Sequence, residues 1–325
     1  MKHYPWLKSQ YIEIIEKYCK YKLHPIILIQ ACKGIGISQL IYKISKWILC
    51  YKKKHYKSCN ECLSCQLIKK KNHPDFYIFY NKTKKIGINV IRQMIHNINY
   101  TSQQGGSKII WFSNINKITN EANNALLKTL EEPPNNTFFF LHTTNIMQIH
   151  PTIKSRSNIY YINTPKEKNN ILWLNNKIKI YSLVQIVTAL RINRNAPIAA
   201  YKFFKKKIFQ ERNLLMKAIN QYIFDHKKIN FLQKIYNYNE QKVIKWICYL
   251  LLDTINYSIS KKCRIKNLDQ VYLIKKITQV NKLQVLNKNL LSWIKCKYLL
   301  SNSYKVDKKL IFTEQFLLWV DIFKK

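Results

Sequence analysis

The chain has 325 residues, a formal net charge of +40 and 47% hydrophobic residues. Its longest apolar runs, such as 138–141 and 249–252, are far too short to cross a bilayer, which argues against a membrane protein. Residues 1–6 lack the apolar segment of a secretory signal, so we expect a cytoplasmic chain without a membrane partner. The length suits two or three domains.

The excess of basic residues indicates a polyanion nearby, because cationic surfaces bind nucleic acid by releasing its counterions. Lysine is plentiful along the whole sequence, however, so charge alone does not locate a binding patch. The nine cysteines do not indicate a disulfide framework, because the cytoplasm keeps thiols reduced. Free thiols or metal ligands are the expected roles.

The first half of the chain alternates short apolar, β-branched or aromatic runs with helical stretches. The runs expected to form strands are residues 26–29, 76–79, 108–112, 137–141 and 158–162. Strands that alternate with helices are typical of a mostly parallel, doubly wound α/β sheet.

A loop with the features of a phosphate loop follows the first strand. In the pattern G-x-x-x-x-G-K-[ST], the lysine reaches the β and γ phosphates and the hydroxyl binds magnesium. Gly36 and Ser38 fit this pattern, but Ala31 replaces the first glycine and Ile37 occupies the lysine position. Gly34 and Gly36 also resemble a dinucleotide-binding turn, although its third glycine is missing. The sequence therefore predicts a degenerate phosphate loop.

The strand at 108–112 should end in carboxylates if the domain binds magnesium and activates water. It ends instead in Ser113 and Asn114, neither of which can hold a hard cation or accept a proton in that way. Two independent losses point to a site that does not hydrolyse ATP. On these residues alone, an unrelated α/β domain that never had such a site remains an alternative.

A cluster of cysteines lies between the phosphate loop and the second strand. Its spacing, C-x8-C-x2-C-x2-C, suits the tetrahedral thiolate shell of zinc and comprises Cys50, Cys59, Cys62 and Cys65. The alternatives are four unlinked thiols, or His55 or His73 in place of one cysteine. A nucleic-acid-binding zinc ribbon is possible, but a closed four-cysteine shell favours a structural staple.

Residues 198–325 contain neither glycine nor proline. Apolar, lysine-rich segments such as 240–255 and 283–300 are therefore expected to form packed helices of a bundle. Pro165 and the polar residues after it indicate a boundary. We expect an α/β domain at 1–163, a small helical domain at 164–205 and a helical domain at 206–325.

Residues 121–134 read EANNALLKTLEEPP, which is consistent with an amphipathic helix capped by Asn120 and stopped by Pro133. This string closely resembles the hallmark of bacterial clamp-loader subunits of the AAA+ family. The segment 4–7, the four cysteines and residues 73–75 follow in the order of that family. The resemblance implies an AAA+ type domain, a helical lid and an all-α collar.

Within that family, a cysteine cluster together with a defective phosphate loop resembles the delta-prime branch of DNA polymerase III and not the ATP-hydrolysing gamma or tau subunits. The resemblance implies a stator-like arm of the polymerase holoenzyme, a nucleotidyltransferase complex, that binds structural zinc but no ATP. The implied partners are gamma or tau and delta subunits in a pentameric ring, and indirectly the sliding clamp and primed DNA.

Ser155, Arg156 and Ser157 match the Ser-Arg-Cys element of the family. The resemblance implies that Arg156 is an arginine finger for the ATP site of the adjacent subunit, beside Ser155. A solvent-facing arginine is the alternative. Ile198 stands where an arginine that senses nucleotide would follow Pro197, so the second domain is not expected to read ATP.

Two rival functions are open at this point. One is an active clamp-loader ATPase, against which Ile37, Ser113 and Asn114 argue. The other is a zinc-containing DNA-binding protein outside the clamp loader, which would bind DNA in a salt-sensitive way without joining a ring.

Overall fold

The computed structural model describes residues 4–80, 85–104, 106–225, 239–302 and 308–321. The chain forms two compact units, Met1–Pro165 and Lys166–Lys325. Among the described residues, no helix is long and apolar enough to pass through a membrane.

The first unit is built on a five-stranded sheet in the order β2-β3-β4-β1-β5, with every neighbouring pair parallel. The strands are β1 (Ile26–Ala31), β2 (Phe76–Phe79), β3 (Lys108–Phe112), β4 (Thr137–Thr143) and β5 (Asn158–Ile162). All five predicted strands are confirmed, and β1 and β4 each extend two residues beyond the prediction. All five residues of β3 are buried, as expected for a central strand covered on both faces.

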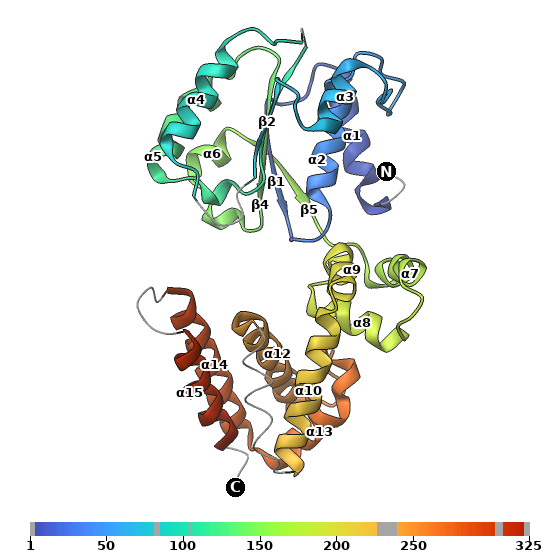
Figure 1. The fold of residues 1–325 in the computed structure, drawn as a ribbon, viewed down its shortest axis with the longest axis vertical. Helices are drawn as coiled ribbons and strands as arrows, with labels where there is room; N and C mark the ends of the chain where they lie inside the picture. The colour runs from blue at the N-terminus through green and yellow to red at the C-terminus, as the bar shows by residue number, and fades with distance from the viewer. Residues whose placement is uncertain (1–3, 81–84, 105, 226–238, 303–307, 322–325) are drawn as a thin grey trace. The chain divides into compact units, whose positions relative to one another are not determined.

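Helices cover both faces of this sheet (Figure 1). One face carries α1 (Lys8–Cys19), α2 (Ile37–Ile48) and α3 (Leu63–Lys70), and the other carries α4 (Ile88–Asn99), α5 (Asn120–Glu131) and α6 (Pro151–Ser155). Short 3-10 helices are η1 (Pro5–Leu7), η2 (Ile115–Lys117) and η3 (Ile146–Gln148). Phe112 and Phe139 of the sheet share one core with Ile91 of α4 and Leu126 of α5. Each such buried side chain contributes roughly 1.5–3 kcal/mol.

Helix α5 begins at Asn120, the residue that was expected to cap it, and its cap is one residue earlier. The cap is Thr119, whose Oγ1 accepts a hydrogen bond from the Ala122 N–H at 3.3 Å, while Asn120 is already the first helical residue. The prediction that Asn120 caps this helix was therefore wrong. Only a residue with extended backbone can point its side chain back at the first free N–H groups, and Thr119 has that backbone (φ −69°, ψ 161°).

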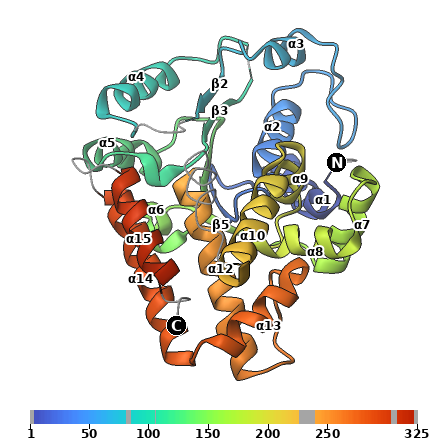
Figure 2. The same ribbon diagram turned by 60° about the horizontal axis from the view of Figure 1, so that its bottom comes forward.

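In the second unit the described residues form helices joined by short loops (Figure 2), as the lack of glycine and proline in residues 198–325 predicts for most of it. Its helices are α7 (Glu167–Lys177), α8 (Leu183–Ile192), α9 (Pro197–Lys205), α10 (Ile208–Asp225), α12 (Glu240–Ile259), α13 (Val271–Val280), α14 (Leu283–Asn302) and α15 (Lys308–Asp321), with η4 at Leu268–Gln270. One continuous hydrophobic core runs from Leu174 to Trp319. The division of this unit into a lid and a collar after Lys205 stays a prediction.

A buried polar network joins α10, α12 and η4. The Arg212 guanidinium is fully buried and donates to Asp269 at 2.6 and 3.0 Å and to the Asn267 side chain at 2.6 Å. Asp253 of α12 in turn accepts from the Asn267 side chain at 2.7 Å and from the Lys266 and Asn267 N–H groups. Since a buried charge is tolerated only when it is paired, these residues fix how the three elements meet.

We expect Arg212→Ala to destabilise the second unit by about 3–5 kcal/mol, because it leaves Asp269 without its buried partner. Arg264→Ala is the matched control. Arg264 pairs with Glu167 at 3.0 Å but is 62% exposed, so its loss should cost about 1 kcal/mol or less. Urea unfolding followed by circular dichroism would compare the two, and equal losses would contradict the assignment.

Candidate nucleotide and metal sites

The loop after β1 has the backbone of a tight phosphate-type turn but not its chemistry. Gly34 (φ 91°) and Gly36 (φ 110°) adopt left-handed conformations that disfavour other residues. Ile37 is the first residue of α2 and is only 5% exposed, so its side chain joins the core. The Trp6 indole N–H donates to the Ile35 carbonyl at 2.9 Å and ties η1 to the loop. Ser38 is exposed, and no cationic side chain occupies the position of the missing lysine.

At the carboxyl end of β3, both residues that replace the expected carboxylates are engaged with backbone. The Ser113 hydroxyl donates to the Phe79 carbonyl at 3.0 Å. The Asn114 side-chain oxygen accepts from the Asn116 N–H at 3.3 Å and caps η2. These side chains stabilise the ends of the strands, and neither offers a general base.

His142 of β4 lies between the loop and β3, and the sequence analysis did not single it out. Its Nδ1 is 2.8 Å from the Ser113 carbonyl oxygen and its Nε2 is 3.4 Å from that of Ala31. Burial lowers the pKa of His142, although both carbonyl contacts act in the opposite direction. A neutral ring that donates from Nδ1 fits these distances. The sequence feature that could have identified His142 is its position as the one ionisable residue in the otherwise apolar strand sequence TFFFLHT.

Arg156 follows α6, and its guanidinium is held within its own unit. Nη1 donates to the Thr152 carbonyl at 3.1 Å, and Nη2 pairs with the Glu131 carboxylate at the end of α5. The Arg156 side chain remains 33% exposed. Ser155 donates from Oγ to the same Thr152 carbonyl at 3.1 Å. The structure thus brings together two motifs that lie 25 residues apart in sequence.

The four predicted cysteine ligands converge on one point. Their sulfur atoms all lie within 4.8 Å of one another, with Sγ–Sγ separations of 3.5 Å for Cys50–Cys59 and 3.9 Å for Cys50–Cys62 and Cys59–Cys65. A tetrahedron with Zn–S bonds of about 2.3 Å has edges of about 3.8 Å. The cluster therefore fits a metal ion such as zinc.

The protonation of the cluster is uneven. The N–H groups of Cys62 and Glu61 lower the pKa of Cys59 to about 6. At Cys62, burial raises the pKa, but contacts led by the N–H groups of Cys65 and Tyr51 outweigh it and lower the pKa overall. Burial raises the pKa of Cys50 and Cys65. These contacts favour the thiolate form at Cys59 and Cys62, whereas burial opposes it at Cys50 and Cys65. A bound cation would stabilise all four sulfurs as thiolates.

His55 and His73, the two histidines considered as alternative ligands, are not part of the cysteine cluster. The buried His73 ring lies 2.9 Å from the Ser64 hydroxyl through Nε2 and accepts from the Asp75 N–H through Nδ1 at 3.1 Å. Within the described parts of the chain, the potential metal-binding group consists of the four cysteines without His55 or His73.

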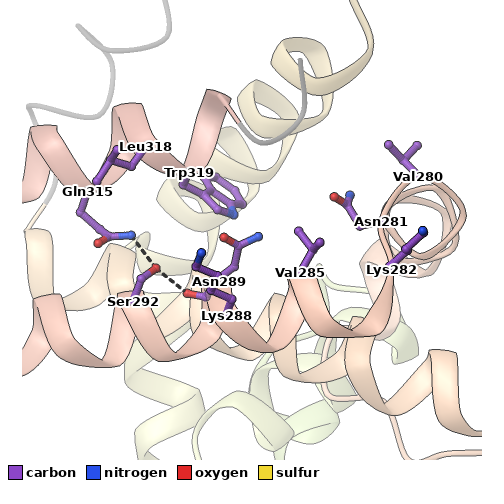
Figure 3. A pocket seen from close by; sticks show the side chains of 10 residues that line it. All are labelled: Val280, Asn281, Lys282, Val285, Lys288, Asn289, Ser292, Gln315, Leu318 and Trp319. Atoms are coloured by element: carbon purple, nitrogen blue, oxygen red, sulfur yellow. Dashed lines mark hydrogen bonds between the residues drawn. The ribbon is translucent and has the colours of Figure 1, made fainter. Parts of the chain in front are cut away.

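The second unit contains an apolar groove of about 670 Å³ between the end of α13, α14 and α15 (Figure 3). Trp319 and Leu318 of α15 and Val285 of α14 line it, and Gln315 donates to the Ser292 hydroxyl at 2.9 Å. Lys282 and Lys288 are the charged residues that line it. The described residues that line this groove include no carboxylate, thiol or imidazole.

The α/β unit, with its parallel sheet and phosphate-type turn, defines an AAA+ type fold that is followed by helices. The crystal structure of a DNA polymerase III gamma subunit-related protein from Thermotoga maritima shares this fold, with a TM-score of 0.54 and 16% identity over 96% of this chain and 99% of that one. The sequence matches the family described as DNA polymerase III, delta subunit, over residues 7–166, and the family of its C-terminal region over residues 206–321.

Two relatives resemble almost the entire chain. It is 37% identical to DNA polymerase III subunit delta' of Buchnera aphidicola subsp. Schizaphis graminum (99% of this chain, 98% of the relative). It is 38% identical to subunit delta' of Buchnera aphidicola subsp. Acyrthosiphon pisum (99% of each). The chain belongs to the DNA polymerase III delta-prime subunit family.

We expect the purified chain to contain about one zinc ion, because four sulfurs converge at distances that suit it. Cys62→Ser should lower the zinc content and the melting temperature. Cys263→Ser, a substitution outside the cluster, should change neither. Elemental analysis and thermal unfolding, with and without a chelator, are the measurements. A metal-free chain of equal stability would exclude the metal as a structural element.

Proposed function

We propose that this chain is a non-hydrolysing, stator-like arm of the DNA polymerase III clamp loader, which helps place the sliding clamp on primed DNA while neighbouring subunits hydrolyse ATP. The single observation that carries the proposal is the burial of Ile37 in the lysine position of a phosphate-type loop. Ser113 and Asn114, both bound to backbone, support it, because neither supplies the carboxylate that magnesium requires.

An exposed apolar face supports assembly with gamma or tau and delta subunits in a pentameric ring. On α14, Leu291, Ile294 and Tyr298 are 49–66% exposed and recur at the spacing of one helix face. Leu310 and Leu317 of α15 are exposed as well. Contiguous apolar surface of this kind is usually covered by a partner. We assign residues 206–325 to a collar domain that makes these contacts, after an AAA+ type domain (1–163) and a lid (164–205).

Arg156 is the residue proposed to act on a neighbouring subunit, with Ser155 beside it. Its guanidinium is partly exposed and always charged, which suits the transition-state charge of a γ phosphate. The ion pair with Glu131 holds it ready at the end of α5. The cysteine cluster is assigned a structural zinc ion that joins the end of α2 to the start of α3.

We expect no saturable, magnesium-dependent binding of ATP by the purified chain at concentrations up to about 1 mM, since Ile37 occupies the position from which a lysine would neutralise the triphosphate. Calorimetric titration is the measurement. Lys33→Ala should give the same result, because Lys33 is exposed and does not replace the missing lysine. Tight binding by the parent chain would favour the rival function, an active clamp-loader ATPase.

We expect Arg156→Ala to lower DNA-stimulated ATP turnover at the neighbouring site, where comparable arginines contribute about 10³ to 10⁵ in rate. The measurement uses a reconstituted complex whose other ATP sites are inactivated. The matched control is Lys154→Ala, which removes one positive charge from α6 but leaves Arg156 in place. It should retain turnover.

Two further results decide this assignment. Glu131→Gln should retain turnover, because it frees the guanidinium without removing it. Unchanged turnover of a fully assembled Arg156→Ala complex would exclude the finger. Failure of the chain to co-purify with other clamp-loader subunits would instead favour the second rival, a zinc-containing DNA-binding protein outside the clamp loader.

A further inference from the structure

The segment between α2 and the metal cluster is a surface of unusual composition. Residues 51–57, the lysine loop, read YKKKHYK, contain no acidic residue and are all exposed. We propose that the lysine loop, together with the end of α1, is a binding site for single-stranded DNA. This inference does not rest on the proposed role in clamp loading.

The lysine loop is a fixed turn. The N–H of Lys54 donates to the Lys57 carbonyl at 3.0 Å, and the N–H of Lys57 donates back to the Lys54 carbonyl at 2.8 Å. Between them, His55 adopts a left-handed backbone (φ 46°), and its carbonyl accepts from the Trp47 indole N–H at 2.8 Å. Tyr11 of α1 donates its hydroxyl to the Tyr56 carbonyl at 2.8 Å. Because the turn is ordered before binding, little conformational entropy is lost when a ligand arrives.

The lysines of this loop contact aromatic rings or solvent and are not paired with acidic side chains in the described part of the chain. The Lys53 ammonium lies 4.9 Å from the Trp47 ring centroid and 5.1 Å from that of Tyr18. Within the described part of the chain, no ion pair involves Lys52, Lys54 or Lys57.

The acidic groups around the loop are few. Glu16 accepts from the Tyr56 hydroxyl at 2.8 Å, and the buried Asp75 accepts from the N–H groups of Gln103 and Gln104. Glu61 follows the loop in sequence and is exposed. A zinc ion with four thiolates carries a net charge of about −2, which together with Glu16 and Glu61 balances the four lysines of the loop. The excess of positive charge at this surface comes from Lys20 and Lys22, which are exposed just after α1. The surface therefore remains cationic.

Aromatic rings stand among these charges. Tyr51 and Tyr56 are 51% and 43% exposed, and their hydroxyls are tied to the Gln104 carbonyl at 2.6 Å and to Glu16, which holds the rings in place. Tyr21, just after α1, is 99% exposed and lies three residues beyond Tyr18, the residue that contacts Lys53. Lysines that follow a backbone and rings that stack on unpaired bases are the features of single-strand binding. Duplex DNA would leave the rings without a base face.

The test measures fluorescence anisotropy of a labelled oligothymidylate of about 20 nucleotides with the full chain. The combined variant Lys52→Ala, Lys54→Ala and Lys57→Ala should weaken binding at least about tenfold. It should also reduce the slope of log K against log salt by about 2, since each phosphate that a lysine neutralises contributes about 0.7 to that slope. Tyr21→Ala should weaken binding roughly tenfold, because removing one stacked base costs about that much.

The matched control removes the same charge elsewhere, by Lys202→Ala, Lys205→Ala and Lys206→Ala, three exposed lysines at the end of α9. An equal loss in the control would overturn the inference, because binding would then reflect the overall charge of +40. Equal affinity for a duplex of the same length, with no effect of Tyr21→Ala, would also overturn it. Zinc content and circular dichroism confirm that each variant is folded.

Discussion

The parallel pairing of β1 with both β4 and β5 is the constraint on which the first unit depends. It brings the ends of β1, β3 and β4 to one edge of the sheet, so Ala31, Ser113 and His142 meet there. In a hydrolase such an edge holds a lysine and carboxylates. Here an apolar residue gains stability by entering the core at Ile37, and neutral side chains close hydrogen bonds to backbone. The same geometry that shapes a nucleotide site thus holds apolar and neutral side chains in this chain.

The charged sites of the first unit lie on separate parts of its surface. The cysteine cluster fits a metal cation, and burial disfavours the thiolates of Cys50 and Cys65 in its absence. The lysine loop beside it carries the opposite charge and is fastened to α1 by Tyr11 and by the rings under Lys53. Arg156 lies at another edge and is restrained by Glu131. The proposed contacts with a metal, a polyanion and a neighbouring subunit thus lie on different surfaces of one fold.

In the second unit, a buried ion pair stabilises the fold, and a separate set of exposed apolar side chains is available for a partner. The buried charges of Arg212 and Asp269 specify how α10 meets η4, since an unpaired charge there would be costly. The exposed stripe on α14 contributes nothing to that core. Its apolar surface is free to be buried by a partner, which is the usual source of stability in a permanent complex.

The sequence by itself determined the five strands, the helical second unit, the four cysteines that converge in one cluster, and the presence of Ile37, Ser113 and Asn114 where a lysine and carboxylates were expected. These features follow from local composition and spacing, which the backbone obeys wherever they occur. Tertiary structure alone decided that Thr119 caps α5, that His142 joins the strand ends, and that Glu131 holds Arg156. It also decided that the lysine loop lies against α1. Each of these results depends on exact backbone geometry or on residues distant in sequence, whose approach is set by packing and not by any local pattern.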